Sequence, residues 1–193
     1  MIIGICGAKG SGKDTAFKIL QSNFPDYKIE KIAFADPIKQ FLCSMLQINE
    51  DQYDTLKRID RLDFVDRSTN ETILTTSGRT LVREIGMKMR SYDCTQFVKY
   101  VQNKVIGNPD TIYVCTDVRF DNEVQFIKQV MRGKLIRIDR AGYQYDNHVT
   151  EQKIENVDCV IKNESFDQFT NNLCRWFNSE VAIEKQSYGI NYN

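Results

Sequence analysis

The sequence predicts a three-layer α/β/α fold, in which a parallel sheet of roughly five strands lies between helices. Short apolar runs alternate with helical patterns along the chain, and the first run, MIIGIC, is almost continuously apolar. Strands that are buried on both faces of a parallel sheet have this composition. Alternation of strands and helices favours a parallel sheet, whose ligands bind in a crevice at the carboxyl ends of the strands.

Each predicted strand is a short apolar run bounded by polar or turn residues. The five strands are expected at residues 1–6, 29–35, 112–116, 135–138 and 158–161. Helices are expected at 13–20, from 36 onwards, at 79–90, 93–105 and 122–131, and from 165 onwards. Residues 48–78 are charge-rich and weakly periodic, so no helix or strand is predicted there.

Three of the helices carry signals for their ends. Asp36 is expected as an N-cap, with Pro37 in the first turn and an apolar stripe at Ile38, Phe41, Leu42, Met45 and Leu46. Gly133 is expected to close the helix at 122–131. Ser165 and Gln168 form a capping box before a buried stripe of Phe166, Phe169, Leu173, Trp176 and Phe177, and the tail from 185 is expected to be loose.

Composition limits the class of protein. The chain has 193 residues and a formal net charge of +0, so it fits one domain and has no global field that would attract nucleic acid or a membrane. Six scattered cysteines and one histidine argue against a zinc cluster and for reduced thiols in the cytoplasm. No apolar run reaches the roughly 20 residues that span a bilayer, and MIIGIC lacks the basic start of a signal peptide.

The segment GAKGSGKDT, residues 7–15, has the spacing of a loop that binds phosphate. It lies between an apolar strand and a helix, which is the structural context that such a loop requires. Backbone N–H groups of residues 9–13 are expected to surround a β-phosphate, and Lys13 is expected to bridge the β- and γ-phosphates. The residues assigned to this triphosphate site are Gly7, Lys9, Gly10, Ser11, Gly12, Lys13, Asp14 and Thr15.

Asp14 stands where a magnesium-binding Ser or Thr is usual in such loops. A carboxylate would repel a bare triphosphate, but it is favourable if Mg²⁺ lies between them. Asp117, at the end of the strand IYVCTD, is a second acid expected to orient magnesium or its waters. Asp14 and Asp117 are therefore the predicted metal ligands, and Thr15 is left to donate its hydroxyl to the α-phosphate.

One helix carries arginines suited to a second phosphate. Arg79, Arg83, Gly86 and Arg90 are four, three and four residues apart, which places them on one face at about 100° per residue. Guanidinium groups on one side, with a glycine between them, suit close approach by a phosphoryl anion. A solvated basic face paired with Glu84 is the alternative.

Further candidates follow the third and fourth strands. Arg119 is expected at the carboxyl edge of the sheet, where it can bridge the donor and acceptor phosphates. Arg140 opens a loop, AGYQYDNHVTE, that can fold over a nucleotide as a short lid and exclude water. His148 and Glu151 lie in this loop, and for the lone histidine a structural hydrogen bond is as good an explanation as a direct role.

The order of these motifs resembles the phage-type deoxynucleoside monophosphate kinases, a branch of the P-loop nucleoside monophosphate kinases. The resemblance rests on GAKGSGKDT, FADPIK (34–39), SGRTLVREIG (77–86), CTDVRFDNEV (115–124), HVTE (148–151) and DCVIKN (158–163). It implies transfer of the ATP γ-phosphate to a deoxynucleoside monophosphate, with Mg²⁺ as cofactor and ATP as donor. The pair GKDT and TDVRF is its most specific part.

The resemblance also implies roles for individual residues. Lys13 and Arg119 would be catalytic, and Arg140 would join the ATP-binding residues. The monophosphate would be bound by Asp36, Lys39, Arg79, Arg83, Arg90, Asp117, Arg119, His148 and Glu151, although Arg83 is assigned from helix geometry alone. The expected organisation is a single P-loop kinase domain, 1–193, with an acceptor-binding excursion at about 48–78 and a lid at about 140–155.

Other functions stay open from sequence. The nearest is a P-loop kinase for another phosphorylated metabolite or coenzyme precursor. A GTP-binding switch would use DRAG (139–142) as a D-x-x-G motif, but a guanine-reading N-K-x-D is missing, since NKVI (103–106) has no acid. The expected partners are small-molecule nucleotides in the cytoplasm (host cytoplasm if the source is viral), without nucleic acid or membrane. A homodimer is an open alternative.

Overall fold

The computed structural model describes residues 1–145 and 152–188, with side chains up to residue 183. The chain forms two compact units, one made of residues 1–34 and 98–193 and the other of residues 35–97. The first unit holds the sheet and the glycine-rich loop. The second unit holds the segment without predicted helices or strands. Each unit is described by itself.

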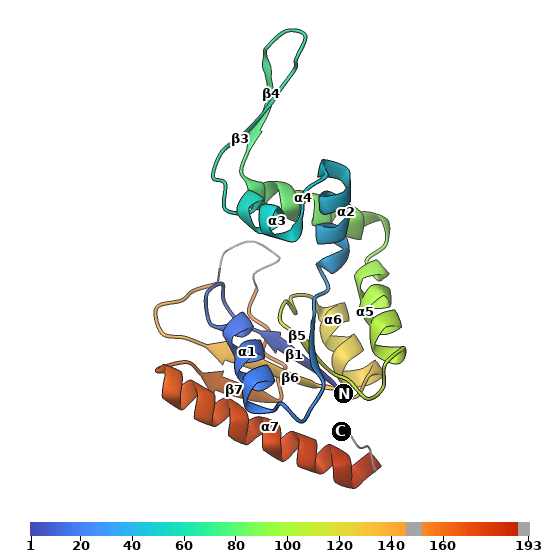
Figure 1. Ribbon diagram of the computed structural model, residues 1–193, viewed down its shortest axis with the longest axis vertical. Helices are drawn as coiled ribbons and strands as arrows, with labels where there is room; N and C mark the ends of the chain where they lie inside the picture. The colour runs from blue at the N-terminus through green and yellow to red at the C-terminus, as the bar shows by residue number, and fades with distance from the viewer. Residues whose placement is uncertain (146–151, 189–193) are drawn as a thin grey trace. The chain divides into compact units, whose positions relative to one another are not determined.

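The sheet of the first unit is parallel throughout. Its strands lie in the order β2 (Ile29–Ile32), β5 (Ile112–Cys115), β1 (Ile2–Cys6), β6 (Lys134–Asp139) and β7 (Cys159–Lys162). The first strand of the chain is therefore central, with β5 and β6 as its neighbours (Figure 1). Chain connections run to opposite sides of β1, which makes its carboxyl end a topological switch point where ligands bind.

One face of the sheet packs against α1 (Lys13–Asn23) and α7 (Phe166–Tyr188). The sheet contributes alternate residues such as Ile3, Ile5 and Ile136 to this core. The helices contribute Leu20 and the buried aromatic residues of α7, Phe169, Trp176 and Phe177. Ser165 Oγ accepts the backbone N–H of Gln168 at 3.3 Å, so the predicted cap at the start of α7 is confirmed.

The opposite face is covered by α5 (Gln96–Ile106), α6 (Asp121–Gln125) and a π-helix, η1 (Phe126–Val130). Gly4 in β1 leaves room for side chains of η1 and β6 to pack against the strand. A Cβ at Gly4 would lie 2.6 Å from Cδ1 of Ile127 and 2.9 Å from Cδ1 of Leu135. The sheet therefore has helices on both faces, and the predicted three-layer α/β/α architecture of the P-loop type is confirmed.

A strand end, a helix cap and a residue predicted to be buried differ from the structure. β2 ends at Ile32, three residues before the predicted end. The N-cap of α2 is Ala35, so Asp36 lies inside the helix instead of capping it. Phe166 is 64% exposed, because it begins α7 and points away from the face that carries Phe169.

The predicted helix 122–131 is divided between α6 and η1. The wider π-helical turn ends at Val130, and the left-handed residue that follows is Arg132, with φ of 51°, instead of Gly133. Gly133 still ends the segment, since its N–H donates to the carbonyl of Ile127 at 2.7 Å. Helix α7 continues to Tyr188, so the first residues of the predicted loose tail are helical.

The second unit contains α2 (Asp36–Leu46), α3 (Glu50–Leu56), the hairpin strands β3 (Leu62–Val65) and β4 (Thr72–Thr76), and α4 (Gly78–Tyr92) (Figure 1). Residues 48–78 thus form regular structure that the weak periodicity did not predict. A capping box between Asn49 and Gln52 starts α3. Asp66 closes the hairpin, because its carboxylate accepts the backbone N–H of Ser68 at 2.7 Å.

No helix among the described residues is both long enough and apolar enough to cross a membrane.

The packing of α7 gives a prediction about stability. Leu173→Ala should lower the free energy of unfolding by about 3 kcal/mol, because it leaves a cavity in a core where Leu173 is fully buried. Ile183→Ala in the same helix should have little effect, since Ile183 is 54% exposed. Urea unfolding followed by circular dichroism measures both values. Equal losses would mean that α7 does not pack on the sheet through Leu173.

Candidate active site

The loop between β1 and α1 is shaped by its glycines. Gly7, Gly10 and Gly12 have φ angles of 141°, 79° and 111°, which side chains rarely adopt. A Cβ at Gly7 would lie 2.5 Å from the carbonyl oxygen of Ile138, so only glycine fits between β1 and β6. Gly12 is the N-cap of α1 and provides no side-chain cap, which leaves the helix N-terminus open to an anion.

Lys13 holds this loop from inside. Its Nζ donates to the carbonyl oxygens of Gly7 and Ala8, both at 2.7 Å. The ammonium group therefore lies at the concave side of the loop, at the carboxyl end of the central strand. A phosphate anion in the loop would meet a positive charge together with the N-terminus of α1.

The other residues of GAKGSGKDT differ in exposure. Lys9, Gly10, Asp14 and Thr15 are exposed. Ser11 is fully buried, and its hydroxyl oxygen has no hydrogen-bond partner among the described residues. Exposed groups around a glycine cradle, with a backbone that presents N–H donors, fit a phosphate chain better than an apolar ligand.

Asn163 fixes the loop from the neighbouring part of the sheet, a role that the sequence did not predict. It follows β7 directly, its Nδ2 donates to the carbonyl of Ser11 at 2.8 Å, and its backbone N–H donates to the carbonyl of Asp139 at 2.8 Å. The feature of the sequence that could have identified Asn163 is its position as a polar residue directly after a predicted strand. Only the sheet order shows that β7 and the loop meet.

Asp14 is held by two partners that the sequence did not predict. Its carboxylate lies 2.6 Å from Nζ of Lys31 and accepts the hydroxyl of Thr116 at 3.1 Å. Partial burial would raise the pKa of Asp14, but the hydrogen bond and charge of Lys31 and the hydroxyl of Thr116 outweigh it and lower that pKa. Asp14 is thus anionic at neutral pH.

Asp117 and Arg119 lie where the sequence predicted, after β5 at the carboxyl edge of the sheet. Asp117 Oδ1 accepts the backbone N–H of Phe34 at 2.9 Å and the thiol of Cys115 at 3.2 Å. Behind Arg119, the buried carboxylate of Glu123 accepts the backbone N–H of Arg119 at 2.8 Å. This contact fixes the backbone from which the Arg119 side chain extends.

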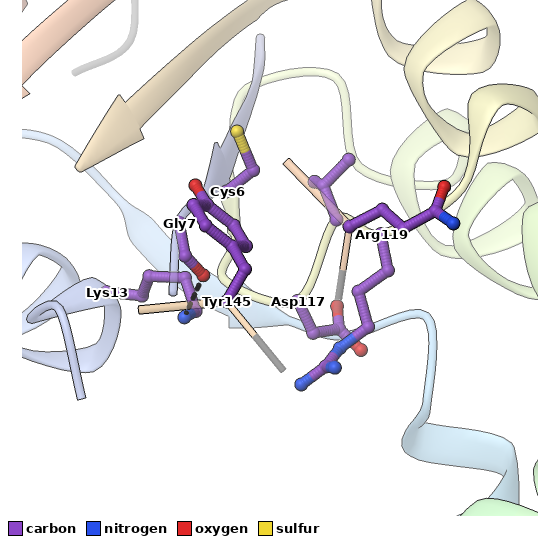
Figure 2. A pocket seen from close by; sticks show the side chains of 8 residues that line it. Cys6, Gly7, Lys13, Asp117, Arg119 and Tyr145 are labelled. Carbon is purple, nitrogen blue, oxygen red and sulfur yellow. Dashed lines mark hydrogen bonds between the residues drawn. The ribbon is translucent and has the colours of Figure 1, made fainter. Parts of the chain in front are cut away.

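A small cavity brings these predicted residues together. Gly7, Lys13, Asp117 and Arg119 all line it, although they come from two distant parts of the sequence (Figure 2). The remaining lining residues are Cys6, Val118, Tyr145 and Gln152. Two cations and one carboxylate at a topological switch point, beside a glycine loop, form a site that can bind and transfer a phosphoryl group.

Arg140, a predicted ATP-binding residue, contacts the glycine loop. Its Nη1 lies 3.4 Å from the carbonyl of Gly10, and its guanidinium lies 4.7 Å from the ring centre of Tyr143. The ring of Tyr143 covers Gly10 so closely that a Cβ there would lie 2.5 Å from Cε1. His148 and Glu151, the other candidates in this loop, lie outside the described residues.

The cysteines at the sheet edge are not activated. Burial raises the pKa of Cys6 to about 12, although Arg137 and Lys13 oppose the shift. Burial, followed by the charge of Asp117, raises the pKa of Cys115 well above its ordinary value. Both thiols therefore stay protonated at neutral pH, and neither is a candidate nucleophile.

The described residues contain no group of three or more His, Cys, Asp or Glu that could hold a metal ion. This does not conflict with the Mg²⁺ expected at Asp14 and Asp117, because Mg²⁺ usually binds one or two carboxylates and completes its shell with substrate phosphates and water. The charged, oxygen-bearing side chain of Asp14 beside the loop fits such an ion.

The predicted acceptor residues Asp36, Lys39, Arg79, Arg83 and Arg90 all belong to the second unit. Nζ of Lys39 lies 2.6 Å from the carboxylate of Glu50. Arg79 is exposed, whereas Arg83 and Arg90 are half-buried. The guanidinium of Arg90 lies 4.3 Å from the ring centre of Phe97.

The interpretation of Gly86 as a gap for a phosphate is wrong. Gly86 is buried, and a Cβ there would lie 2.7 Å from Cδ1 of Ile38. The glycine lets α2 pack closely on α4. The helical face that it shares with the arginines is therefore partly occupied by protein.

The fold and the site define a class, the P-loop type of phosphotransferase, and comparison with known proteins defines the family. Residues 1–104 match the family model described as deoxynucleotide monophosphate kinase. A relative from Acanthamoeba polyphaga mimivirus, whose name assigns it to the deoxynucleotide monophosphate kinases, is 32% identical over 184 residues, covering 88% of this chain and 92% of the relative.

Solved structures with low sequence identity are also similar. Dephospho-CoA kinase from Campylobacter jejuni is 11% identical, with 92% of this chain and 96% of that chain covered and a TM-score of 0.47. APS kinase from Mycobacterium tuberculosis is 11% identical with the same two coverages, 92% and 96%, and a TM-score of 0.44.

This chain belongs to the deoxynucleotide monophosphate kinase family. It is therefore a phosphotransferase that acts on deoxynucleotide monophosphates, and the resemblance seen in its motifs is confirmed.

The environment of the cysteines gives a prediction about their reactivity. At pH 8, iodoacetamide should modify exposed Cys94 more than about a hundredfold faster than Cys6, because a thiol with a pKa near 12 is almost never ionised at that pH. Peptide mass spectrometry with time measures both rates. Comparable rates in the folded protein would show that Cys6 is open to solvent and ionised, and full modification in urea provides the control.

Proposed function

We propose that the protein transfers the γ-phosphate of ATP to a deoxynucleoside monophosphate in a magnesium-dependent reaction, giving ADP and a deoxynucleoside diphosphate. The observation that supports this most directly is the shared cavity of Lys13 and Arg119 beside the glycine loop. One cation comes from the loop that would hold the donor triphosphate. The other comes from the neighbouring strand end.

The two cations would act on the charge that develops during transfer. An oxygen of the acceptor monophosphate attacks the γ-phosphorus, and the bond from that phosphorus to the β-γ bridging oxygen breaks. The transition state is loose and carries its charge on the γ-oxygens, so fixed cations and positioning supply the catalysis. No strong base is needed, because a phosphate monoester with a second pKa near 6 is already ionised at neutral pH.

Donor binding is assigned to the glycine loop. N–H groups of residues 9–13 and the N-terminus of α1 would bind the β-phosphate, and Lys13 would leave the carbonyls of Gly7 and Ala8 for the β- and γ-oxygens. Thr15 and Arg140 are the further donor contacts. Mg²⁺ bound near Asp14 and Asp117 would neutralise part of the triphosphate charge.

Acceptor binding is assigned to the residues that the sequence predicted for the monophosphate. Lys39, Arg79 and Arg90 would supply positive charge for the monophosphate, and Asp36 is included because the family resemblance implies it. Arg83 is added from helix geometry alone. Arg119 would supply positive charge from the sheet edge, beside Asp117. His148 and Glu151 stay predictions from the sequence.

A GTP-binding switch is less well supported. Asp139, the acid of the D-x-x-G motif, is bound by the guanidinium of Arg137 at 2.9 Å, so it is committed to an ion pair inside the fold. A kinase for another phosphorylated metabolite shares the same donor site. A product assay with ATP, Mg²⁺ and each monophosphate in ribo and deoxy form separates the two kinases, because only the proposed function yields a deoxynucleoside diphosphate.

Lys13→Ala should lower phosphoryl transfer by about a hundredfold to a thousandfold while the protein remains folded, because a fixed cation at the γ-oxygens is lost. Lys18→Ala is the matched control, since Lys18 is exposed on the same helix. Diphosphate formation is measured by chromatography, and folding by thermal melting. Activity within a few-fold of the unchanged chain would reject the assignment of the loop.

Asp14→Asn should raise the Mg²⁺ concentration needed for half-maximal activity by about tenfold, because an amide is a weaker ligand than a carboxylate. The substitution also breaks the pair with Lys31, so Lys31→Met is the control that removes the pair and keeps the carboxylate. A magnesium titration of activity compares the two. If Lys31→Met changes the requirement as much as Asp14→Asn does, Asp14 acts through its ion pair and not as a ligand.

A further inference from the structure

Arg137 is a buried cation that the proposed reaction does not use. It lies in β6, opposite Cys6 in the register of the sheet, and its side chain is only 9% exposed. An arginine cannot lose its charge in a protein, so its burial must be compensated by carboxylates and carbonyls. The groups that compensate it show what Arg137 holds in place.

The groups that compensate the charge of Arg137 lie on both sides of residues 140–153 in the sequence. Nε and Nη2 of Arg137 bind the two carboxylate oxygens of Asp139 at 2.9 and 3.3 Å. Nη1 donates to the carbonyl of Ile154 at 3.0 Å and to Glu155 Oε2 at 3.1 Å. Asp139 precedes residues 140–153, and Ile154 and Glu155 follow them. One rigid, forked side chain therefore joins the two flanks.

The flanks carry two residues of the cavity wall. Tyr145 lines it together with Lys13 and Arg119 (Figure 2). Gln152 is a further lining residue. The hydroxyl oxygen of Tyr145 is buried and has no hydrogen-bond partner among the described residues. The ring is therefore held by packing and by the backbone that carries it, and this backbone lies between Asp139 and Ile154, the two flanks that Arg137 contacts.

We propose that Arg137 is a positioning residue of the phosphoryl-transfer site. By joining Asp139 to Ile154 and Glu155, it holds Tyr145 and Gln152 in the cavity wall and so limits the access of water to the γ-phosphate. The inference rests on the proposed function.

Loss of this anchor has a specific chemical consequence. Water replaces the monophosphate as acceptor: the bond from the γ-phosphorus to the bridging oxygen of ADP breaks, a bond to the water oxygen forms, and a proton passes to solvent. The products are ADP and inorganic phosphate. A role confined to stability would lower transfer and hydrolysis together and leave their ratio unchanged.

The test measures the ratio of ATP hydrolysis to phosphoryl transfer in the full chain with Mg²⁺ and a deoxynucleoside monophosphate. Arg137→Gln should raise this ratio about tenfold, and Arg137→Lys, which keeps the charge without the fork, by a smaller factor. Glu155→Gln should raise it about threefold. Glu30→Gln is the control, because Glu30 forms an exposed pair with Lys28 on edge strand β2.

Hydrogen exchange gives a readout that does not depend on activity. Amides of residues 140–145 and 152–158 should exchange about tenfold faster in Arg137→Gln and remain unchanged in Glu30→Gln. If Arg137→Gln does not fold, Glu155→Gln decides, since its side chain is 69% exposed and outside the core.

The outcomes are separable. A raised ratio together with faster exchange supports the inference. An unchanged ratio in folded variants overturns it, whether or not exchange is faster, as does an equal rise in Glu30→Gln. If the protein without substitutions makes no diphosphate from ATP, the proposed function fails. In that case, hydrogen exchange that is no faster in the Arg137 and Glu155 variants would also overturn the role of Arg137 in holding the two flanks.

Discussion

The site depends on one constraint, the backbone conformation of the loop between β1 and α1. Positive φ angles at Gly7, Gly10 and Gly12 turn the chain sharply enough to aim N–H groups and a helix N-terminus at one point. Asn163 holds that shape through the carbonyl of Ser11. A loop fixed in this way needs little reorganisation to receive an anion, which is the condition for strong electrostatic catalysis.

The sheet order brings further charged residues to this loop. Because β5 and β6 both pair with β1, the residues that follow them lie beside the loop. Asp117 and Arg119 come from one neighbour, and Asp139, Arg140 and the flanks held by Arg137 come from the other. At this edge a carboxylate holds the guanidinium of Arg137, and another holds the backbone N–H of Arg119, whereas Lys13 contacts backbone carbonyls.

Much of the fold was predictable, and the exceptions have physical causes. The central strands β1 and β5 were found because a strand buried on both faces must be apolar, as in IIGIC and IYVC. The hairpin was missed because β3 and β4 lie largely in solvent, and their sequences alternate too weakly to show a buried face. Gly86 was misinterpreted because spacing locates a helical face but cannot say whether a ligand or another helix, here α2 through Ile38, lies against it.

The sequence by itself determined the phosphate loop, its lysine, the unusual Asp14, the acid and arginine after the third predicted strand, and the family. These are local signals, because a turn that needs glycine and a helix start that carries a lysine are set by neighbouring residues. Only the tertiary structure decided the partners: Lys31 and Thr116 for Asp14, Asn163 for the loop, Glu123 behind Arg119, and Arg137 across the two flanks. Such pairs join residues far apart in the chain, and no local pattern records which strands become neighbours.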